Sequence, residues 1–200
     1  MNLQDRLVAG SHHGAMTTTT SNADLYRRLA AELTRRVEAV PADRWDNSSP
    51  CEGWTARDVL RHVIETQSFP VNAAGMTLPA VPDVAVDPVG AWTQTRDAVQ
   101  EILDDPERAD REYEGQMGTA KVSDTFGSFY TFDLVVHGWD IAKATGADTA
   151  IDPGDLAMLA RFAERMGEAL HGPGVCGPAV AVPADADEQT RVLGLLGRRA

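Results

Sequence analysis

Asp133 and His137 lie four residues apart in a segment whose apolar periodicity predicts a helix. Side chains with this spacing leave a helix on the same side, so the carboxylate and the imidazole point in one direction. That side is also the apolar side of the predicted helix, which carries Phe126, Phe129, Tyr130, Leu134 and Ile141. An unpaired carboxylate is costly to bury, so both polar groups need partners inside the fold.

His62 is the third member of this candidate site. It lies between Leu60 and Val63 and is partly on the inward side of another predicted helix. Two histidines and one carboxylate on facing helices offer three ligands to Zn²⁺, Fe²⁺, Ni²⁺ or Mn²⁺ and leave positions open for water or substrate. The spacing also permits a different interpretation, in which Asp133 and His137 form a hydrogen-bonded structural pair without a metal.

Other residues carry weaker signals. Cys51 precedes a predicted helix, where a thiolate is favoured, but Glu52 beside it opposes this, so we interpret Cys51 as a packing residue. Asp140 follows His137 by about one turn and could accept a hydrogen bond from its imidazole, although a helix–helix contact or a capping role is the simpler expectation. We interpret Trp54 and Trp139 as core residues. Arg96 and Tyr130 could bind an anionic substrate, although structural roles are the simpler expectation. Arg61 is next to His62 in the chain, so the two side chains project about 100° apart.

Five predicted helices must position these residues. They run over 23–40, from 55 to just before 70, and over 89–103, 123–145 and 153–170. Ser21 or Asn22 would cap the first helix, Thr55 and Asp58 resemble a capping box for the second, and Gly146 suits the end of the fourth. We therefore predict an all-α fold, a four-helix bundle with an extra C-terminal helix and an irregular tail.

Two connections are long. The segment 72–88 holds three prolines and could act as a lid, whereas 107–122 could be a loop or a short pair of strands. The tail beyond the fifth helix is rich in glycine and proline and ends in an apolar patch around 193–196. His171 falls at a helix end, outside the candidate site.

Length and charge limit the classes of function. The chain has 200 residues, 30 of them acidic and 18 basic, with a net charge of −12. This balance argues against nucleic acid or an anionic membrane as a partner, because both require a basic surface. No apolar run is long enough for a spanning helix. Two cysteines are too few for a disulfide framework, and we expect a reducing, cytoplasmic location.

The first sixteen residues differ in character from the rest. They contain no hydrophobic signal-peptide core, and GSHHGAM at 10–16 resembles a cloning remnant. We interpret 1–16 as a leader or vector-derived segment, together with its histidines His12 and His13. The remainder, 17–200, is expected to form a single helical metal-binding domain.

Three segments of the chain together form a recognisable motif. After Arg44 and Trp45, residues 49–63 read SPCEGWTARDVLRHV, and residues 132–142 read FDLVVHGWDIA. The third segment is the tail over 162–197, which includes VPAD at 182–185. With these segments the chain resembles the DinB-like superfamily, in the branch of the mycothiol-dependent maleylpyruvate isomerase N-terminal domain. The pairing of CEGWTxRDxxxH with HGWDxA carries most of the resemblance.

The resemblance implies a four-helix bundle with one divalent ion bound by His62, Asp133 and His137. We expect Zn²⁺ first, with Ni²⁺, Fe²⁺ and Mn²⁺ as alternatives. The branch commonly has Glu, and other members have His, where this chain has Asp133. The isomerase also has a second domain, of which this chain holds at most a short tail.

The function that the resemblance implies is that of a metal-dependent transferase or isomerase using a low-molecular-weight thiol of the mycothiol type. The metal would stabilise the thiolate, which attacks an electrophilic small molecule, and no further residue is needed as a general base. The alternative is a non-enzymatic metal-binding or stress-response module with a structural metal. The family's bundles also pair through helices, which would allow a homodimer.

Overall fold

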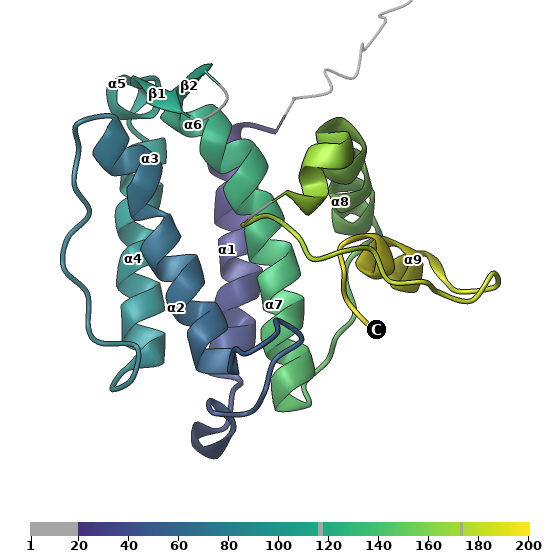
Figure 1. The fold of residues 1–200 in the computed structure, drawn as a ribbon. Helices are drawn as coiled ribbons and strands as arrows, with labels where there is room; N and C mark the ends of the chain where they lie inside the picture. Colours follow the sequence, from purple (N-terminus) through teal and green to yellow (C-terminus); the bar gives the residue numbers. More distant parts are fainter. Residues whose placement is uncertain (1–19, 116–117, 173) are drawn as a thin grey trace, which may run out of the picture.

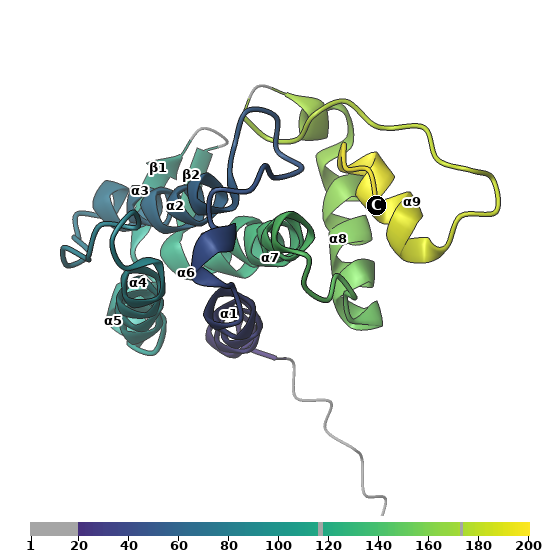
Figure 2. The ribbon, with the colours of Figure 1, turned by 90° about the horizontal axis from the view of Figure 1, so that it is seen from below.

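Four long helices pack side by side in the computed structural model, which describes residues 20–115, 118–172 and 174–200 (Figure 1). They are α1 (Asn22–Glu38), α2 (Ala56–Thr66), α4 (Pro88–Leu103) and α7 (Thr131–Thr145). Helices α1 and α2 each pack against both α4 and α7, so the four form a closed bundle (Figure 2). The predicted all-α four-helix bundle is confirmed. The segment 1–16 and its two histidines lie outside the described residues.

Two more helices lie beside α7, outside the bundle. Helix α8 (Pro153–Met166) packs on α7, and α9 (Glu188–Leu195) packs on α8 (Figure 1). A short 3₁₀ turn, η3 (Gly167–His171), follows α8. Together with α7 they enclose a second apolar cluster centred on Leu159, Phe162, Leu193 and Leu196. The extra C-terminal helix and irregular tail are therefore present, and the tail contains a helix of its own.

The connections hold short elements. They are η1 (Ala42–Arg44), α3 (Ser68–Ala73), α5 (Pro106–Ala109), β1 (Glu112–Gly115), β2 (Gly118–Lys121), α6 (Val122–Thr125) and η2 (Phe126–Tyr130). Strands β1 and β2 are antiparallel, with Tyr113 opposite Ala120. Of the two alternatives for 107–122, the strand pair is the one that forms.

Capping residues fix where α2 begins and where α7 ends. The Thr55 hydroxyl accepts a hydrogen bond from the Asp58 backbone N–H, and the Asp58 carboxylate accepts one from the Thr55 N–H, which is a complete capping box. Gly146 ends α7 in the left-handed conformation, with φ of 74°. Both features agree with the sequence-based prediction, and they fix the ends of the helices that carry His62 and His137.

The second predicted helix differs from expectation near its end. Helix α2 stops at Thr66, and α3 begins at Ser68 and includes Pro70. Proline is tolerated there because the first turn of a helix has N–H groups without intrahelical partners. The chain therefore stays helical past the proline, after a one-residue interruption at Gln67, which itself has helical dihedral angles.

The fourth predicted helix is present, because residues 122–145 are helical throughout, but its hydrogen-bond pattern changes near its start. Phe126–Tyr130 form one turn of π-helix, directly before the α7 turn that carries Asp133. Gly127 lies against α1, and a Cβ there would meet the Asn22 side chain at 2.2 Å. The Tyr130 hydroxyl donates to the Thr66 carbonyl at 2.6 Å, where α2 has ended. This bond ties the end of α2 to the start of α7.

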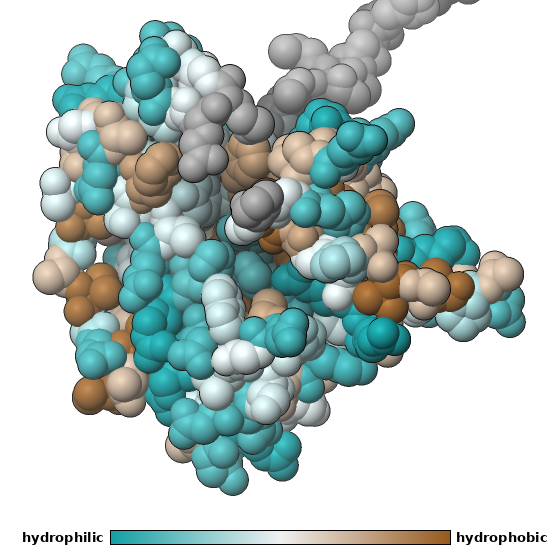
Figure 3. Space-filling model, in the orientation of Figure 1, coloured by the Kyte–Doolittle hydropathy of each residue, from teal (hydrophilic) through white to brown (hydrophobic). Residues whose placement is uncertain are grey.

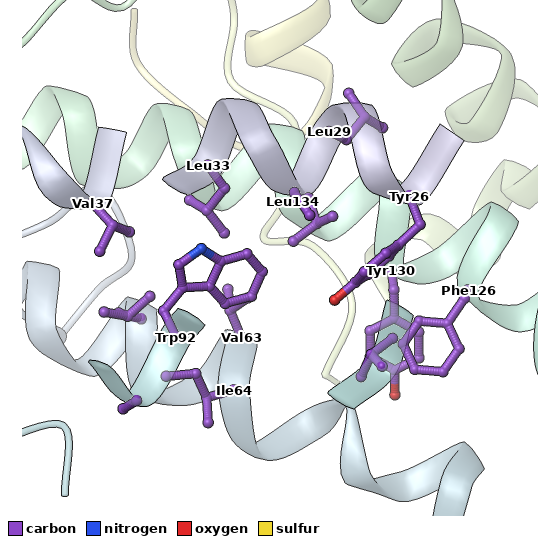
Figure 4. Close-up of a cluster of buried hydrophobic side chains, with 14 of the residues drawn as sticks. Tyr26, Leu29, Leu33, Val37, Val63, Ile64, Trp92, Phe126, Tyr130 and Leu134 are labelled. Atoms are coloured by element: carbon purple, nitrogen blue, oxygen red, sulfur yellow. The ribbon is translucent and has the colours of Figure 1, made fainter. Parts of the chain in front are cut away.

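Large side chains fill the bundle interior. Trp92 is fully buried, and Figure 4 shows it between α1 residues such as Leu33 and α2 residues such as Val63. Its indole N–H donates to Thr34 at 2.8 Å, so no polar atom of this side chain is left unpaired. The core holds α2 and α7 at a fixed spacing, which the site requires.

The segment between α3 and α4 was a candidate lid. It lies on the side of the bundle away from α7, where Val84 is buried and Arg57 donates to its carbonyl at 3.0 Å (Figures 1 and 2). It is therefore not placed to cover Asp133 and His137.

Figure 3 shows a mostly hydrophilic face with hydrophobic residues along the edge where this segment runs. Among the described residues, no helix is both long and apolar enough to cross a membrane.

Candidate metal centre

His62, Asp133 and His137 meet between α2 and α7. Each offers one ligand atom, and these atoms all lie within 4.8 Å of one another. The two imidazole rings are 5.1 Å apart between centroids, with an interplanar angle of 77°. His137 is buried, while His62 and Asp133 are partly exposed. The three residues are thus close enough to share one ion, at a site where two of the three side chains are partly exposed to solvent.

The two histidines have opposite pKa shifts. Burial, assisted by the neighbouring His137, lowers the pKa of His62 to about 4. Burial alone would also lower the pKa of His137, but the hydrogen bond with Asp140 and other polar contacts outweigh it and raise the value to about 10. Burial raises the pKa of Asp133, against the opposing charge of His137. Without a metal, the cluster therefore retains a proton at neutral pH.

Asp140 supports His137 from behind. It is fully buried, and its Oδ2 lies 3.0 Å from His137 Nδ1. Burial alone would raise the pKa of Asp140, but the hydrogen bond with His137 and the charge of Arg198 outweigh it and lower the value. Nδ1 is engaged by this carboxylate, which leaves Nε2 as the ring nitrogen available to a metal. Of the roles considered for Asp140, the hydrogen bond with the His137 imidazole is the one that forms, although a helix–helix or capping role was the simpler expectation.

Cys51, His137 and Asp140 form a second group with ligand atoms within 4.8 Å of one another. The positively charged guanidinium of Arg198 already lies against this group, because its Nη2 is 3.0 Å from Asp140 Oδ2 and 3.6 Å from Cys51 Sγ. The Cys51 thiol donates to the same carboxylate oxygen at 3.3 Å. A second positive charge would meet the guanidinium there, so this group fits a hydrogen-bonded cluster better than a metal site.

The two tryptophans of the family motif have different environments. Trp139 is 1% exposed and belongs to the apolar cluster under α8, as expected. Trp54 is 36% exposed, and its ring centroid lies 5.0 Å from that of His62. The prediction that Trp54 is a core residue is therefore wrong. Trp54 follows the glycine turn before α2, and it forms an exposed aromatic wall beside the candidate ligand.

The remaining candidates are engaged elsewhere. Arg61 pairs with Asp58 on its own helix, and Arg96 pairs with Asp97 and donates to Thr34. His171 is exposed, and its Nδ1 lies 2.7 Å from the carbonyl oxygen of Gly177. Of these side chains, none forms part of the His62 group. Tyr130 stays close to the site through its bond to α2, which makes its role structural.

Sequence reasoning missed Arg198. Its guanidinium is buried against Asp140, although the residue comes long after α7 in the chain. A local signal was present, because a glycine follows the apolar run of α9 and Arg198 comes directly after it. That pattern predicts a helix end, but it does not indicate which distant carboxylate the arginine reaches.

Comparisons with known proteins agree with the motifs. The model of the mycothiol maleylpyruvate isomerase N-terminal domain family matches residues 26–142. Proteins of two Mycobacterium tuberculosis strains, both described as uncharacterised, are 31% identical over 153 residues, which are 74% of this chain and 81% of each relative. The matched family range holds all three candidate ligands and Asp140, but ends before α8, α9 and Arg198.

A solved structure supports the fold. The crystal structure of a mutant of the mycothiol-dependent maleylpyruvate isomerase superposes with a TM-score of 0.52 at 16% sequence identity, over 80% of this chain and 73% of that chain. At this identity the likeness concerns the fold alone. The helical bundle that the motifs predicted is thereby confirmed.

Proposed function

This chain belongs to the mycothiol maleylpyruvate isomerase N-terminal domain family, and from that premise we propose a metal-dependent thiol transferase or isomerase. The co-substrate is a low-molecular-weight thiol of the mycothiol type, and the second substrate is an electrophilic small molecule. The observation that carries the proposal is the cluster of His62, Asp133 and His137, whose ligand atoms lie within 4.8 Å of one another.

The donor set fits a divalent ion of the Zn²⁺, Ni²⁺, Fe²⁺ or Mn²⁺ type. Two imidazole nitrogens and one carboxylate oxygen are typical of sites that keep positions open, with Zn²⁺ the first expectation. Asp140 orients one of the two imidazoles, as the partners of metal-bound histidines commonly do. When bound, the ion supplies Lewis acidity, which lowers the pKa of a thiol that reaches it.

The side chains around the cluster contribute orientation and access. His137 is held rigidly by the buried Asp140, while the partial exposure of His62 and Asp133 leaves an approach for a small molecule. The exposed indole of Trp54 forms an apolar wall beside that approach. The substrate would thus contact the polar side chains of α2 and α7 and, beside them, the aromatic ring of Trp54.

The alternative function is a module with a structural metal. Structural zinc sites are closed by four protein ligands, whereas this group holds three within the part of the chain that the structure describes. Cys51 is the nearby side chain best suited to complete such a set, but it is engaged with Asp140 and Arg198. The three-ligand group therefore favours an open site and the enzymatic proposal.

The first experiment is the metal content of protein purified without chelator, measured by plasma mass spectrometry. We expect about one ion per chain. His137→Ala should abolish it, and the matched control His171→Ala should retain it, because His171 is exposed and outside the group. Full metal retention in His137→Ala would remove the assignment of the site.

The second experiment separates the enzyme from the module. Cobalt-substituted protein is titrated with mycothiol and, in parallel, with glutathione. A new sulfur-to-cobalt charge-transfer band indicates that a thiol reaches an open position, as the proposed enzyme requires. An unchanged spectrum up to millimolar thiol, together with a large loss of stability on chelation, would instead identify a structural metal.

A further inference from the structure

We propose that Arg198 is a positioning residue for the metal centre, acting through Asp140 on His137. This inference rests on the proposed function, because it assigns a role within that site. The guanidinium approaches the carboxylate with two nitrogens: Nε lies 3.3 Å from Oδ1 and Nη2 lies 3.0 Å from Oδ2. Such a two-point contact holds a carboxylate in one orientation, which a single contact does not.

The fixed carboxylate in turn fixes the imidazole. Oδ2 of Asp140 contacts both Arg198 Nη2 and His137 Nδ1, each at 3.0 Å. A rotation of the carboxylate would break both contacts, so the plane of the His137 ring depends on the arginine two contacts away. Metal binding requires a ring nitrogen aimed within a narrow range of angles, which makes that orientation relevant to affinity.

The backbone delivers Arg198 to this position. Gly197 has φ of +79°, and the N–H groups of Gly197 and Arg198 donate back to the carbonyls of Gly194 and Leu193 at 3.1 and 2.8 Å. These two bonds form a Schellman motif at the end of α9. A Cβ on Gly197 would also lie 2.9 Å from the Gly177 carbonyl oxygen. The chain after α9 is therefore turned towards α7 by a defined structure.

Anchoring α9 does not by itself require this ion pair. Leu193 and Leu196 are fully buried in the apolar cluster under α8, so hydrophobic contacts already hold the helix. Buried ion pairs commonly stabilise a fold no more than apolar side chains of similar volume. If the ion pair served only to anchor α9, there would be no reason for Asp140 to lie between Arg198 and the candidate ligand His137. This position is the feature that the positioning role explains.

The test is a double-mutant cycle on zinc affinity, measured by competition with a chromophoric chelator. Arg198→Met and Asp140→Asn should each weaken Zn²⁺ binding about 10–100-fold, as expected for residues that orient a ligand. The double variant should bind no more weakly than Asp140→Asn alone, because Arg198 acts only through that carboxylate. Arg199→Met is the matched control, since Arg199 is exposed, and it should retain full affinity.

One further variant and a metal-free measurement complete the design. Arg198→Lys keeps the charge but loses the two-point contact, so it should recover only part of the affinity, and it serves if Arg198→Met does not fold. In metal-free protein labelled with ¹⁵N-histidine, the Nδ1 proton of His137 should exchange slowly in the wild type and in Arg199→Met, and faster in Arg198→Met.

The outcomes separate this inference from the proposed function. Wild-type protein without zinc affinity would overturn the proposed function, while the exchange measurement would still report whether Arg198 orders His137. Wild-type affinity in Arg198→Met, or additive losses in the double variant, would overturn the role of Arg198 and leave the metal site intact.

Discussion

His62 and His137 lie with ring centroids 5.1 Å apart, yet the pKa of one is lowered to about 4 and that of the other is raised to about 10. The difference has a structural cause. His137 has the buried carboxylate of Asp140 beside it, whereas His62 faces an aromatic ring and another imidazole. At neutral pH the metal-free cluster therefore contains one neutral histidine and one protonated histidine.

Metal binding should release a proton at neutral pH. His62 is already neutral, but the ion must displace the proton of His137. Zinc affinity should therefore rise by about tenfold per pH unit between roughly pH 6 and 9. Calorimetric titrations in buffers of different ionisation enthalpy measure the number of protons released. An affinity independent of pH across this range would contradict the assigned protonation of His137.

The stability of the metal-free protein should be greatest near pH 6.5. The lowered pKa of His62 contributes stability above about 6.5 that is lost as the pH falls through about 4. The raised pKa of His137 contributes stability below about 6.5 that is lost as the pH rises through about 10. Chemical unfolding in EDTA tests both limbs: His62→Gln should flatten the acid limb and His137→Gln the alkaline limb. If neither limb changes, other groups control the profile.

The affinity for Zn²⁺ should depend on the charge of the Asp133 side chain more than on its length. Asp133→Asn removes the anionic ligand and should weaken Zn²⁺ binding by more than about tenfold, or 1.4 kcal/mol. Asp133→Glu keeps the charge and adds one methylene, and it should retain binding because the residue is only partly buried. Chelator competition compares the two variants. Equal affinity of Asp133→Asn and wild type would mean that Asp133 does not contact the metal.

The parts of the site that lie on single helices were predictable from the sequence. The spacing of Asp133 and His137, and the capping box before His62, are local patterns that depend on helix geometry. Arg198 and Trp54 were not predictable in the same way. Arg198 reaches Asp140 only because α9 packs on α8. Trp54 is exposed beside His62, although it lies directly before the capping box of α2. Both outcomes depend on tertiary packing, which the local sequence does not encode.

Two tryptophans offer a contrast between stability and substrate binding. Trp139→Ala empties part of the cluster under α8 and should cost about 3–5 kcal/mol in the free energy of unfolding. Trp54→Ala removes an exposed side chain and should cost less than about 1 kcal/mol. If Trp54 borders the substrate, its variant should raise KM for the thiol or the electrophile while zinc affinity stays unchanged. An unchanged KM would place the substrate elsewhere.

The contact between α2 and α7 has a kinetic consequence. The ligands come from segments far apart in the sequence, so an expanded chain cannot assemble them before the bundle has packed. Interactions that are absent from the folding transition state slow unfolding and leave the folding rate almost unchanged. Bound zinc should therefore lengthen the lifetime of the native state in denaturant without accelerating refolding. Loss of the ion should raise the unfolding rate while the native fold itself stays the same.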